Sequence, residues 1–297
     1  MGLKELWAEM TGARLEPGAY RYDGEGELAH HRFHLRVDSA RRGILIVDAS
    51  GLVELNGTAL EYARCVLEGR SEKRAVKHML RRYRHLDAGT AAAHFNQVRE
   101  QIVRFVRGET GVIEIIGADS PTIGADDFPA PYRMDVMLTY RCQNRCGHCY
   151  NEPRELRELT AEEWEKAIDR LWKYGVPHLV FTGGEPTQSP HLRRLIDRAE
   201  KNGQVAGLVT NGRALSEPGY LNDLIDVGLD HVQITVLSHR PEVHDRLVRS
   251  EGAWAETMKG LDIALSSDLY VNTNTTIMRA TLPDVEETLR FLIGKGV

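Results

Sequence analysis

The sequence predicts a chain of two parts, in which a small α+β unit precedes a larger α/β unit built on a parallel sheet. The larger unit is predicted because short apolar segments alternate five times with helical segments between residues 132 and 297. This alternation is typical of consecutive β–α units joined by right-handed crossovers. The smaller unit is predicted because three strand-like segments are followed by three helical segments between residues 30 and 108.

The small unit is defined by its turn and cap signals. Strands are expected at Arg32–Val37, Gly43–Val47 and Leu52–Leu55, and helices at Thr58–Leu67, Ser71–Tyr83 and Thr90–Val106. We expect Thr58 to cap the first helix. Residues 1–29 are interpreted as a lead segment. Residues 109–131, rich in Gly, Pro and Asp, are interpreted as a linker with one short strand at Val112–Ile116.

In the larger unit, residues 132–297, predicted strands and helices alternate in the order that is typical of a parallel sheet. Strands are expected at Met134–Thr139, His178–Thr182, Val205–Thr210, His231–Val236 and Tyr270–Met278. Helices are expected at Thr160–Tyr174, Pro190–Lys201, Tyr220–Val227, Trp254–Leu265 and Pro283–Lys295. Functional side chains of such sheets lie in the loops after the carboxyl ends of the strands. Because a sixth strand is expected where the sequence stops, we expect a barrel truncated at its C-terminus.

Composition narrows the class of protein. The chain has 297 residues, a formal net charge of −5 and 27% charged residues, which gives no reason to expect a nucleic-acid or membrane partner. No apolar run approaches the ~20 residues that cross a bilayer, and the N-terminus does not resemble a signal peptide. Four cysteines argue against a disulfide framework. We therefore expect a cytoplasmic protein.

Three of those cysteines, Cys142, Cys146 and Cys149, follow the first predicted strand with the spacing C-x3-C-x2-C. Thiolates are soft ligands that suit zinc or iron–sulfur clusters. A closed site of either kind needs four ligands. His148 adjoins Cys149, and Cys65 lies within a predicted helix of the small unit, where we expect a buried structural thiol. Three ligands leave one position open, as in catalytic sites. An iron–sulfur cluster, a zinc site and a redox thiol pair all stay open from the spacing alone.

A second motif, Gly183-Gly184-Glu185-Pro186, follows the second predicted strand. Glycines allow a ligand to approach the backbone closely, and the Glu185 carboxylate can accept hydrogen bonds from an ammonium group. By itself this motif is equally typical of a strand-to-helix turn. Its place one β–α unit after the cysteines makes a functional role the stronger interpretation.

Together the two motifs resemble those of the radical S-adenosylmethionine (radical SAM) superfamily, over about residues 132–297. That family has C-x3-C-x-Φ-C, where Φ is usually aromatic and is His148 here, and a GGE motif matched by Gly183, Gly184 and Glu185. The resemblance implies a partial (β/α)6 barrel and a [4Fe–4S] cluster whose three irons bind the cysteines. Its fourth iron binds S-adenosylmethionine. The resemblance also implies that an electron-donor protein drives cofactor cleavage to a 5′-deoxyadenosyl radical, which abstracts a substrate hydrogen.

The resemblance also implies further cofactor-binding residues on the later strands. Those assigned are Thr210 and Asn211, after the third strand, and Gln233 and Thr235, on the fourth. Asn274 and Thr276 are additional candidates. The family often has I-S-L-D-G where this chain has ITVLS, so Leu237 replaces an acid. No catalytic residue is assigned.

Several titratable residues near these strands are interpreted as structural. Histidines 231, 239 and 244 are candidates for acid–base groups at the barrel mouth. We interpret all three as surface or loop residues. Asp245 is interpreted as a residue at a helix start.

Residues 30–108 resemble PqqD-like domains, which are small winged-helix-like units that recognise peptides. The matching features are the hairpin, the L-N-G-T-A turn into a helix and the L-E-G-R-S helix end. The resemblance implies that the third strand edge and the third helix hold an extended leader peptide by β-augmentation. A basic face is formed by Arg70, Lys73, Arg74, Lys77, Arg81, Arg82 and Arg84. We interpret this face as a solvated surface rather than a nucleic-acid site, with an acidic peptide as the alternative.

The predicted function is that of a radical SAM enzyme that modifies a ribosomally made precursor peptide. Two alternatives stay open. One is a radical SAM enzyme that acts on a small molecule or cofactor precursor. The other is a non-catalytic peptide-binding protein with a degenerate barrel.

Overall fold

The computed structural model describes residues 15–38, 42–48, 51–109, 130–151 and 157–297. The chain divides into two compact units whose boundary falls between Pro131 and Tyr132. Residues 1–14 of the predicted lead segment and residues 110–129 of the predicted linker, including the strand expected at Val112–Ile116, lie outside the described residues. Within these residues, no helix is long and apolar enough to cross a membrane.

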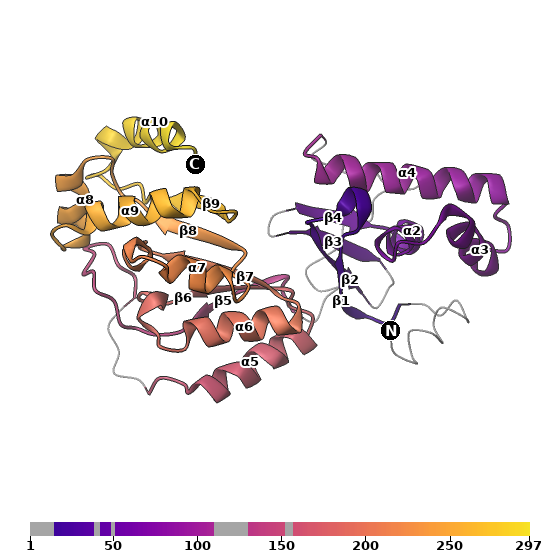
Figure 1. Cartoon of the computed structure of the whole chain (residues 1–297), viewed down its shortest axis with the longest axis horizontal. Coiled ribbons are helices and arrows are strands. Elements are labelled where there is room, and N and C mark those ends of the chain that lie inside the picture. Colours follow the sequence, from indigo (N-terminus) through magenta and orange to yellow (C-terminus); the bar gives the residue numbers. More distant parts are fainter. Residues whose placement is uncertain (1–14, 39–41, 49–50, 110–129, 152–156) are drawn as a thin grey trace. The chain divides into compact units, whose positions relative to one another are not determined.

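The small unit is an antiparallel four-stranded sheet followed by three helices (Figure 1). Its strands are β1 (Gly18–Asp23), β2 (Arg32–Val37), β3 (Gly43–Val47) and β4 (Gly51–Leu55), in that order across the sheet. Its helices are α2 (Gly57–Leu67), α3 (Glu72–Arg82) and α4 (Ala88–Val106), with a short 3-10 turn η1 (Gly26–Leu28) before β2. Strand β1 falls in the predicted lead segment. The prediction of three strands was wrong because β1 is a half-exposed edge strand without a continuous apolar face.

The core of the small unit lies between its sheet and its helices. Phe33, Leu35 and Leu45 of the sheet and Tyr62 and Ile102 of the helices are almost completely buried. Alternate residues of a strand point to the same face, so the apolar residues of β2 and β3 meet the helices on one side. Burial of this kind contributes about 25 cal/mol for each Å² of apolar surface removed from water.

Two local predictions for the small unit have different outcomes. The cap of α2 is Asn56 and not Thr58, because the Asn56 Oδ1 atom accepts hydrogen bonds from the Thr58 and Ala59 backbone N–H groups. Cys65 is completely buried in α2, as predicted. Burial raises the pKa of its thiol to about 12, so this cysteine is an inert core residue.

The larger unit has the predicted parallel sheet. Its strands are β5 (Arg133–Met137), β6 (His178–Thr182), β7 (Val205–Thr210), β8 (His231–Thr235) and β9 (Tyr270–Asn274), paired in sequence order (Figure 1). Its helices are α5 (Ala161–Lys173), α6 (Leu192–Asn202), α7 (Tyr220–Ile225), α8 (Pro241–Val248), α9 (Ala253–Leu265) and α10 (Val285–Lys295). Short 3-10 turns occur at η3 (Pro186–Gln188), η4 (Ala214–Ser216) and η5 (Leu282–Asp284).

The central strands and the helix starts show why this sequence folds locally as it does. Leu179, Val180 and Phe181 of β6 are completely buried, which is the environment of a strand covered on both faces. Helix α5 begins with a capping box, in which Glu163 N–H donates to Thr160 Oγ1 and Thr160 N–H donates to the Glu163 carboxylate. Helix α8 was not predicted. It places the segment after β8 close to the cysteine loop.

Candidate functional site

A cavity of about 1350 Å³ lies at the carboxyl ends of β5 to β9. Its walls come from the loop after β5, the loop after β6 and the last residues of β7 and β8, with α8 contributing on one side. The predicted residues among those lining it are Cys142, Cys146, Cys149, Gly183, Gly184, Glu185, Thr210, Asn211, Thr235, Asn274, Thr276 and His244. Gln233 lies on β8 but is not among the lining residues. The structure therefore brings together nearly all of the residues that the two motifs singled out.

The cysteine loop is held in place by backbone contacts with the end of α8. Arg145 N–H donates to the Val248 carbonyl at 2.9 Å, and Gly147 N–H donates to the Leu247 carbonyl at 3.1 Å. Arg213, after β7, donates from Nη1 to the Asn144 side-chain oxygen at 2.6 Å. All three cysteines of the loop are free thiols at least partly open to solvent. The loop is thus supported from outside, and its thiols stay accessible.

The two glycines of the second motif accommodate the cysteine loop. Gly184 N–H donates to the Thr139 carbonyl at 2.7 Å, and Glu185 N–H donates to the Arg141 carbonyl at 2.8 Å. A Cβ atom on Gly184 would lie 2.4 Å from the Arg141 carbonyl oxygen, and one on Gly183 would lie 2.5 Å from that of Thr139. We expected these glycines to admit a ligand to the backbone. In the structure, the backbone of the cysteine loop approaches them closely, and the approach of a ligand stays a prediction.

Glu185 is buried and bonded to the neighbouring loops. Its Oε1 atom accepts hydrogen bonds from Thr187 N–H (3.1 Å), Thr187 Oγ1 (2.8 Å) and Thr210 Oγ1 (2.7 Å), and its Oε2 atom accepts one from Asn211 N–H (2.8 Å). Burial raises the pKa of this carboxyl, and the bonds from Asn211, Thr210 and Thr187 oppose that rise. The carboxylate therefore clamps the loop after β6 to the loop after β7. The ammonium-binding role that we expected of Glu185 stays a prediction.

The thiols affect one another electrostatically. Burial, together with the neighbouring Cys142 and Cys149, raises the pKa of Cys146 to about 11. Burial is likewise the main cause of the raised pKa of Cys142. Three thiolates here would repel one another, and bound iron cations would offset that repulsion. The donor set therefore fits a cationic metal centre.

Among the described residues, no group of three or more His, Cys, Asp or Glu side chains is arranged to hold a metal ion. A single zinc ion binds all of its ligands at one centre, whereas an iron–sulfur cluster bonds each thiolate to a separate iron.

The histidines lie differently from our expectation. His231 starts β8, at the opposite end of the sheet, and its Nε2 atom lies 2.7 Å from that of His178. His244 lines the cavity, and its Nδ1 atom accepts a hydrogen bond from Leu237 N–H. Both are buried, which lowers the pKa of each to about 4. The prediction of surface or loop residues was wrong for these two.

His239 and Asp245 have structural contacts. The His239 backbone N–H donates to Thr288 Oγ1 of α10, at 3.3 Å. The Asp245 carboxylate accepts hydrogen bonds from the N–H groups of Gly252 and Trp254, at 2.7 Å each. It therefore caps the start of α9 rather than that of its own helix.

The cavity is also lined by three residues that were not predicted, Asn151, Arg141 and Glu158. Asn151 Nδ2 donates to the Gly183 carbonyl at 2.7 Å. Arg141 Nη2 pairs with Glu158 at 3.0 Å, and both residues line the cavity. The only sequence signal for these residues is proximity to the cysteines. Their partners lie up to 32 residues away along the chain.

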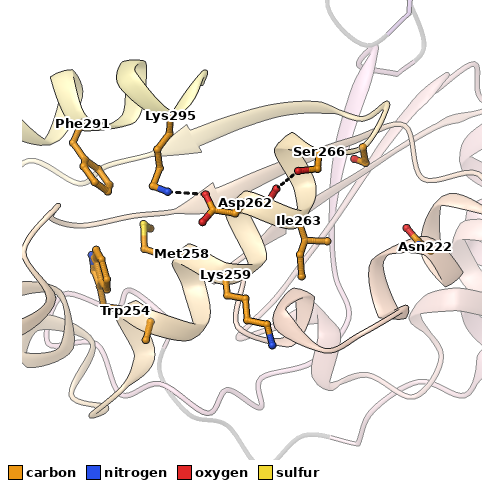
Figure 2. Close-up of a pocket in the computed structure, with 11 residues that line it drawn as sticks. Asn222, Trp254, Met258, Lys259, Asp262, Ile263, Ser266, Phe291 and Lys295 are labelled. Carbon is orange, nitrogen blue, oxygen red and sulfur yellow. Dashed lines mark hydrogen bonds and ion pairs between the residues drawn. The ribbon is translucent and has the colours of Figure 1, made fainter.

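A second cavity, of about 820 Å³, lies between α9 and α10 (Figure 2). Trp254, Met258 and Phe291 line it, and Lys295 pairs with Asp262 at its side. Neither motif contributes a residue to its lining. We therefore place the candidate site at the cysteine-lined cavity.

The site therefore combines three free cysteines and a glycine-rich loop at the carboxyl edge of a parallel α/β sheet, a donor set that fits an iron–sulfur cluster. The radical SAM superfamily model matches residues 136–292, and the chain belongs to that superfamily. The family uses a [4Fe–4S] cluster and S-adenosylmethionine.

Three similar proteins illustrate the relationship. The chain is 34% identical over 172 residues to the PqqA peptide cyclase of Ruegeria pomeroyi, covering 57% of this chain and 46% of that protein. It is 26% identical to the subtilosin biosynthesis protein AlbA of Bacillus subtilis, covering 56% and 38%. The crystal structure of Streptococcus suis SuiB bound to the precursor peptide SuiA matches with a TM-score of 0.59 and 16% identity, covering 94% and 62%. This chain spans less than half the length of the two curated relatives.

Proposed function

We propose that this protein is a radical SAM enzyme that abstracts a hydrogen atom from a precursor peptide held by its N-terminal unit. The observation that carries the proposal is the cavity at the carboxyl edge of the sheet. Three free thiols, the glycine loop and the polar ends of β7, β8 and β9 share its walls. Its volume of about 1350 Å³ exceeds the usual range of small-molecule pockets, about 300–1,000 Å³. Cofactor and part of a substrate therefore fit together.

The proposed cluster ligands are Cys142, Cys146 and Cys149. When bound, the cluster supplies the electron that cleaves S-adenosylmethionine. For the cofactor itself we propose Gly183, Gly184, Glu185, Thr210, Asn211, Gln233 and Thr235, of which Gln233 has the least support because it does not line the cavity. The chain holds this site rigidly through Glu185 and Arg213, which tie the loops after β5, β6 and β7 together.

The proposed peptide site is the free edge of β4 beside α4. In the described residues, β4 is hydrogen-bonded to β3 alone and forms one edge of the sheet. Phe105 of α4 lies against Gly51 of β4, because a Cβ atom there would be 2.7 Å from its ring. An extended peptide can add to such an edge through backbone hydrogen bonds, while the helix provides side-chain contacts. The PqqD-like resemblance and the relatives named for peptide substrates support this assignment.

The charges of the small unit favour an acidic leader. Arg82 and Arg70 of the predicted basic face are paired with Glu61 and Glu68, so they serve the fold. Exposed cations remain on α3 and just beyond it at Lys73, Arg74, Lys77, Arg81 and Arg84. An acidic segment of a leader bound nearby would meet these side chains.

The first experiment tests the chemistry. The chain is reconstituted anaerobically with iron and sulfide, reduced, and supplied with S-adenosylmethionine, and 5′-deoxyadenosine is quantified. We expect product from the native chain and none from a variant with all three clustered cysteines changed to Ala. A control variant, Cys65→Ser, should still load the cluster because Cys65 belongs to the core of the small unit and not to the cysteine motif. Failure of the native chain to bind iron would contradict the proposal.

The second experiment tests the peptide. Short peptides encoded beside the gene are added, and amide hydrogen exchange of the whole chain is followed. We expect the amides of Gly51–Leu55 to become protected, because β-augmentation satisfies the edge of β4. Binding of none of these peptides would favour the small-molecule alternative. Peptide binding without any cofactor cleavage would favour the non-catalytic alternative.

A further inference from the structure

Asn211 has a buried donor that faces the cysteine cavity. The residue follows β7 and lines the cavity with Cys142. Its Nδ2 group is buried and has no hydrogen-bond partner among the described residues. A buried amide donor without a partner is unfavourable, and such groups are retained where a ligand or reacting group satisfies them.

Every other polar group of Asn211 is occupied by the surrounding chain. Its N–H donates to Glu185 Oε2 at 2.8 Å, and its carbonyl accepts from Thr257 Oγ1 at 2.9 Å. Its Oδ1 atom accepts from Arg213 N–H at 3.0 Å and from Gln143 Nε2 at 3.4 Å. Rotating the amide by half a turn would place its NH2 group against two donors. The orientation of the amide is therefore determined, and Nδ2 is its one remaining donor group.

The Cys142 sulfur lines the same cavity as Asn211 and can accept a hydrogen bond from this donor. Gln143 follows Cys142 in the sequence, and its Nε2 atom donates to the Asn211 amide oxygen at 3.4 Å. The Asn211 side chain therefore lies beside the cysteine loop. Asn144 N–H already donates to Cys142 Sγ at 3.4 Å. A thiolate sulfur is a stronger acceptor than a thiol.

We propose that Asn211 donates an N–H···S hydrogen bond to the iron-bound Cys142 thiolate and thereby raises the reduction potential of the cluster. This inference rests on the proposed function, since it requires a cluster at the three cysteines. Hydrogen bonds to the ligand sulfurs stabilise the more negative, reduced form of a cluster. In this role Asn211 acts through the Cys142 sulfur, as a positioning and tuning residue.

The test is a redox titration of the reconstituted chain without S-adenosylmethionine, followed by electron paramagnetic resonance of the one-electron-reduced cluster. Iron and sulfide content is measured first for every variant. We expect Asn211→Ala to load the cluster and to lower the equilibrium constant for its reduction roughly tenfold, which corresponds to about 59 mV for one electron. Asn222→Ala, an exposed asparagine of α7, is the matched control and should leave the potential unchanged.

A second variant tests whether any change in potential comes from misfolding of Asn211→Ala. Asn211→Asp keeps the oxygen that accepts from Arg213 N–H but has no N–H donor, so it should fold and show a potential at least as low as that of Asn211→Ala. An unchanged potential in both variants, with weakened S-adenosylmethionine binding, would overturn the inference and make Asn211 a cofactor ligand. Failure of the native chain to load a cluster would instead contradict the proposed function.

Discussion

Glu185→Ala tests whether the acid of the glycine-rich motif acts as a clamp between loops. The Glu185 side chain is 1% exposed and accepts from Thr210 Oγ1 and Asn211 N–H across to the next loop. Each bond to a charged group contributes about 1.5–3 kcal/mol. The two bonds from Thr187 are not counted, because Thr187 is half-buried and water can accept from its donors when the carboxylate is removed. The raised pKa of Glu185 shows that burying the charge has its own cost, so we take the lower value for each of the two bonds.

The expected loss is therefore about 3 kcal/mol of the free energy of unfolding of the larger unit. Urea unfolding of the metal-free chain under reducing conditions measures it. Tryptophan fluorescence reports on the larger unit, which contains Trp164, Trp172 and Trp254. Glu251→Ala, an exposed glutamate, is the matched control and should change the free energy by less than about 0.5 kcal/mol.

The same variants distinguish the two roles of this acid. If Glu185→Ala lowers the free energy of unfolding by less than about 1 kcal/mol but abolishes S-adenosylmethionine binding, the clamp is refuted. The carboxylate is then a direct ligand of the cofactor, as the sequence suggested. A stability loss of the expected size, with Glu185→Gln intermediate, supports the clamp.

Three further outcomes are expected. Gly184→Ala should lower the iron content of the reconstituted chain severalfold, because its Cβ atom would lie 2.4 Å from the Arg141 carbonyl; Gly294→Ala, where a Cβ atom meets nothing within 4 Å, should load normally. Acid should destabilise the larger unit through His231, whose pKa falls from 6.5 to about 4 on burial. A depressed pKa means that the folded state binds fewer protons. The contribution of His231 to the free energy of unfolding is therefore fully present above pH 6.5. As the pH falls from 6.5 toward 4, the free energy of unfolding decreases by about 1.4 kcal/mol per pH unit and by about 3 kcal/mol in all. His231→Phe should flatten the dependence of urea midpoint on pH over that range, and an unchanged slope would contradict the assignment. Asn56→Ala should lower the stability of the small unit by about 1 kcal/mol through loss of the α2 cap, as followed by thermal circular dichroism; no change would show that Thr58 or water replaces it.

The sequence by itself determined the features that depend on neighbouring residues. Strands β6 and β7 were predicted with the bounds that the structure has, because a short apolar run between turn signals is a local pattern. The capping box of Thr160 and Glu163 is likewise local. The cysteine spacing, read with the glycine motif, was sufficient to indicate the superfamily. Parallel pairing then placed both motifs at one edge of the sheet, because each follows the carboxyl end of a strand.

Only the tertiary structure decided what the individual side chains do. Gly183 and Gly184 lie against the backbone of the cysteine loop. Glu185 is hydrogen-bonded to the loop after β7, and His231 contacts His178 at the first residues of β8 and β6. Each of these contacts joins residues from different β–α units, so no local spacing encodes it. The half-exposed β1 was missed for a related reason, since its pairing with β2 and not its own apolar pattern makes it a strand. A polar atom that is already hydrogen-bonded to residues far away in the sequence stabilises the fold, whereas one without such a partner is free to bind a ligand. The tertiary structure decides between these two cases.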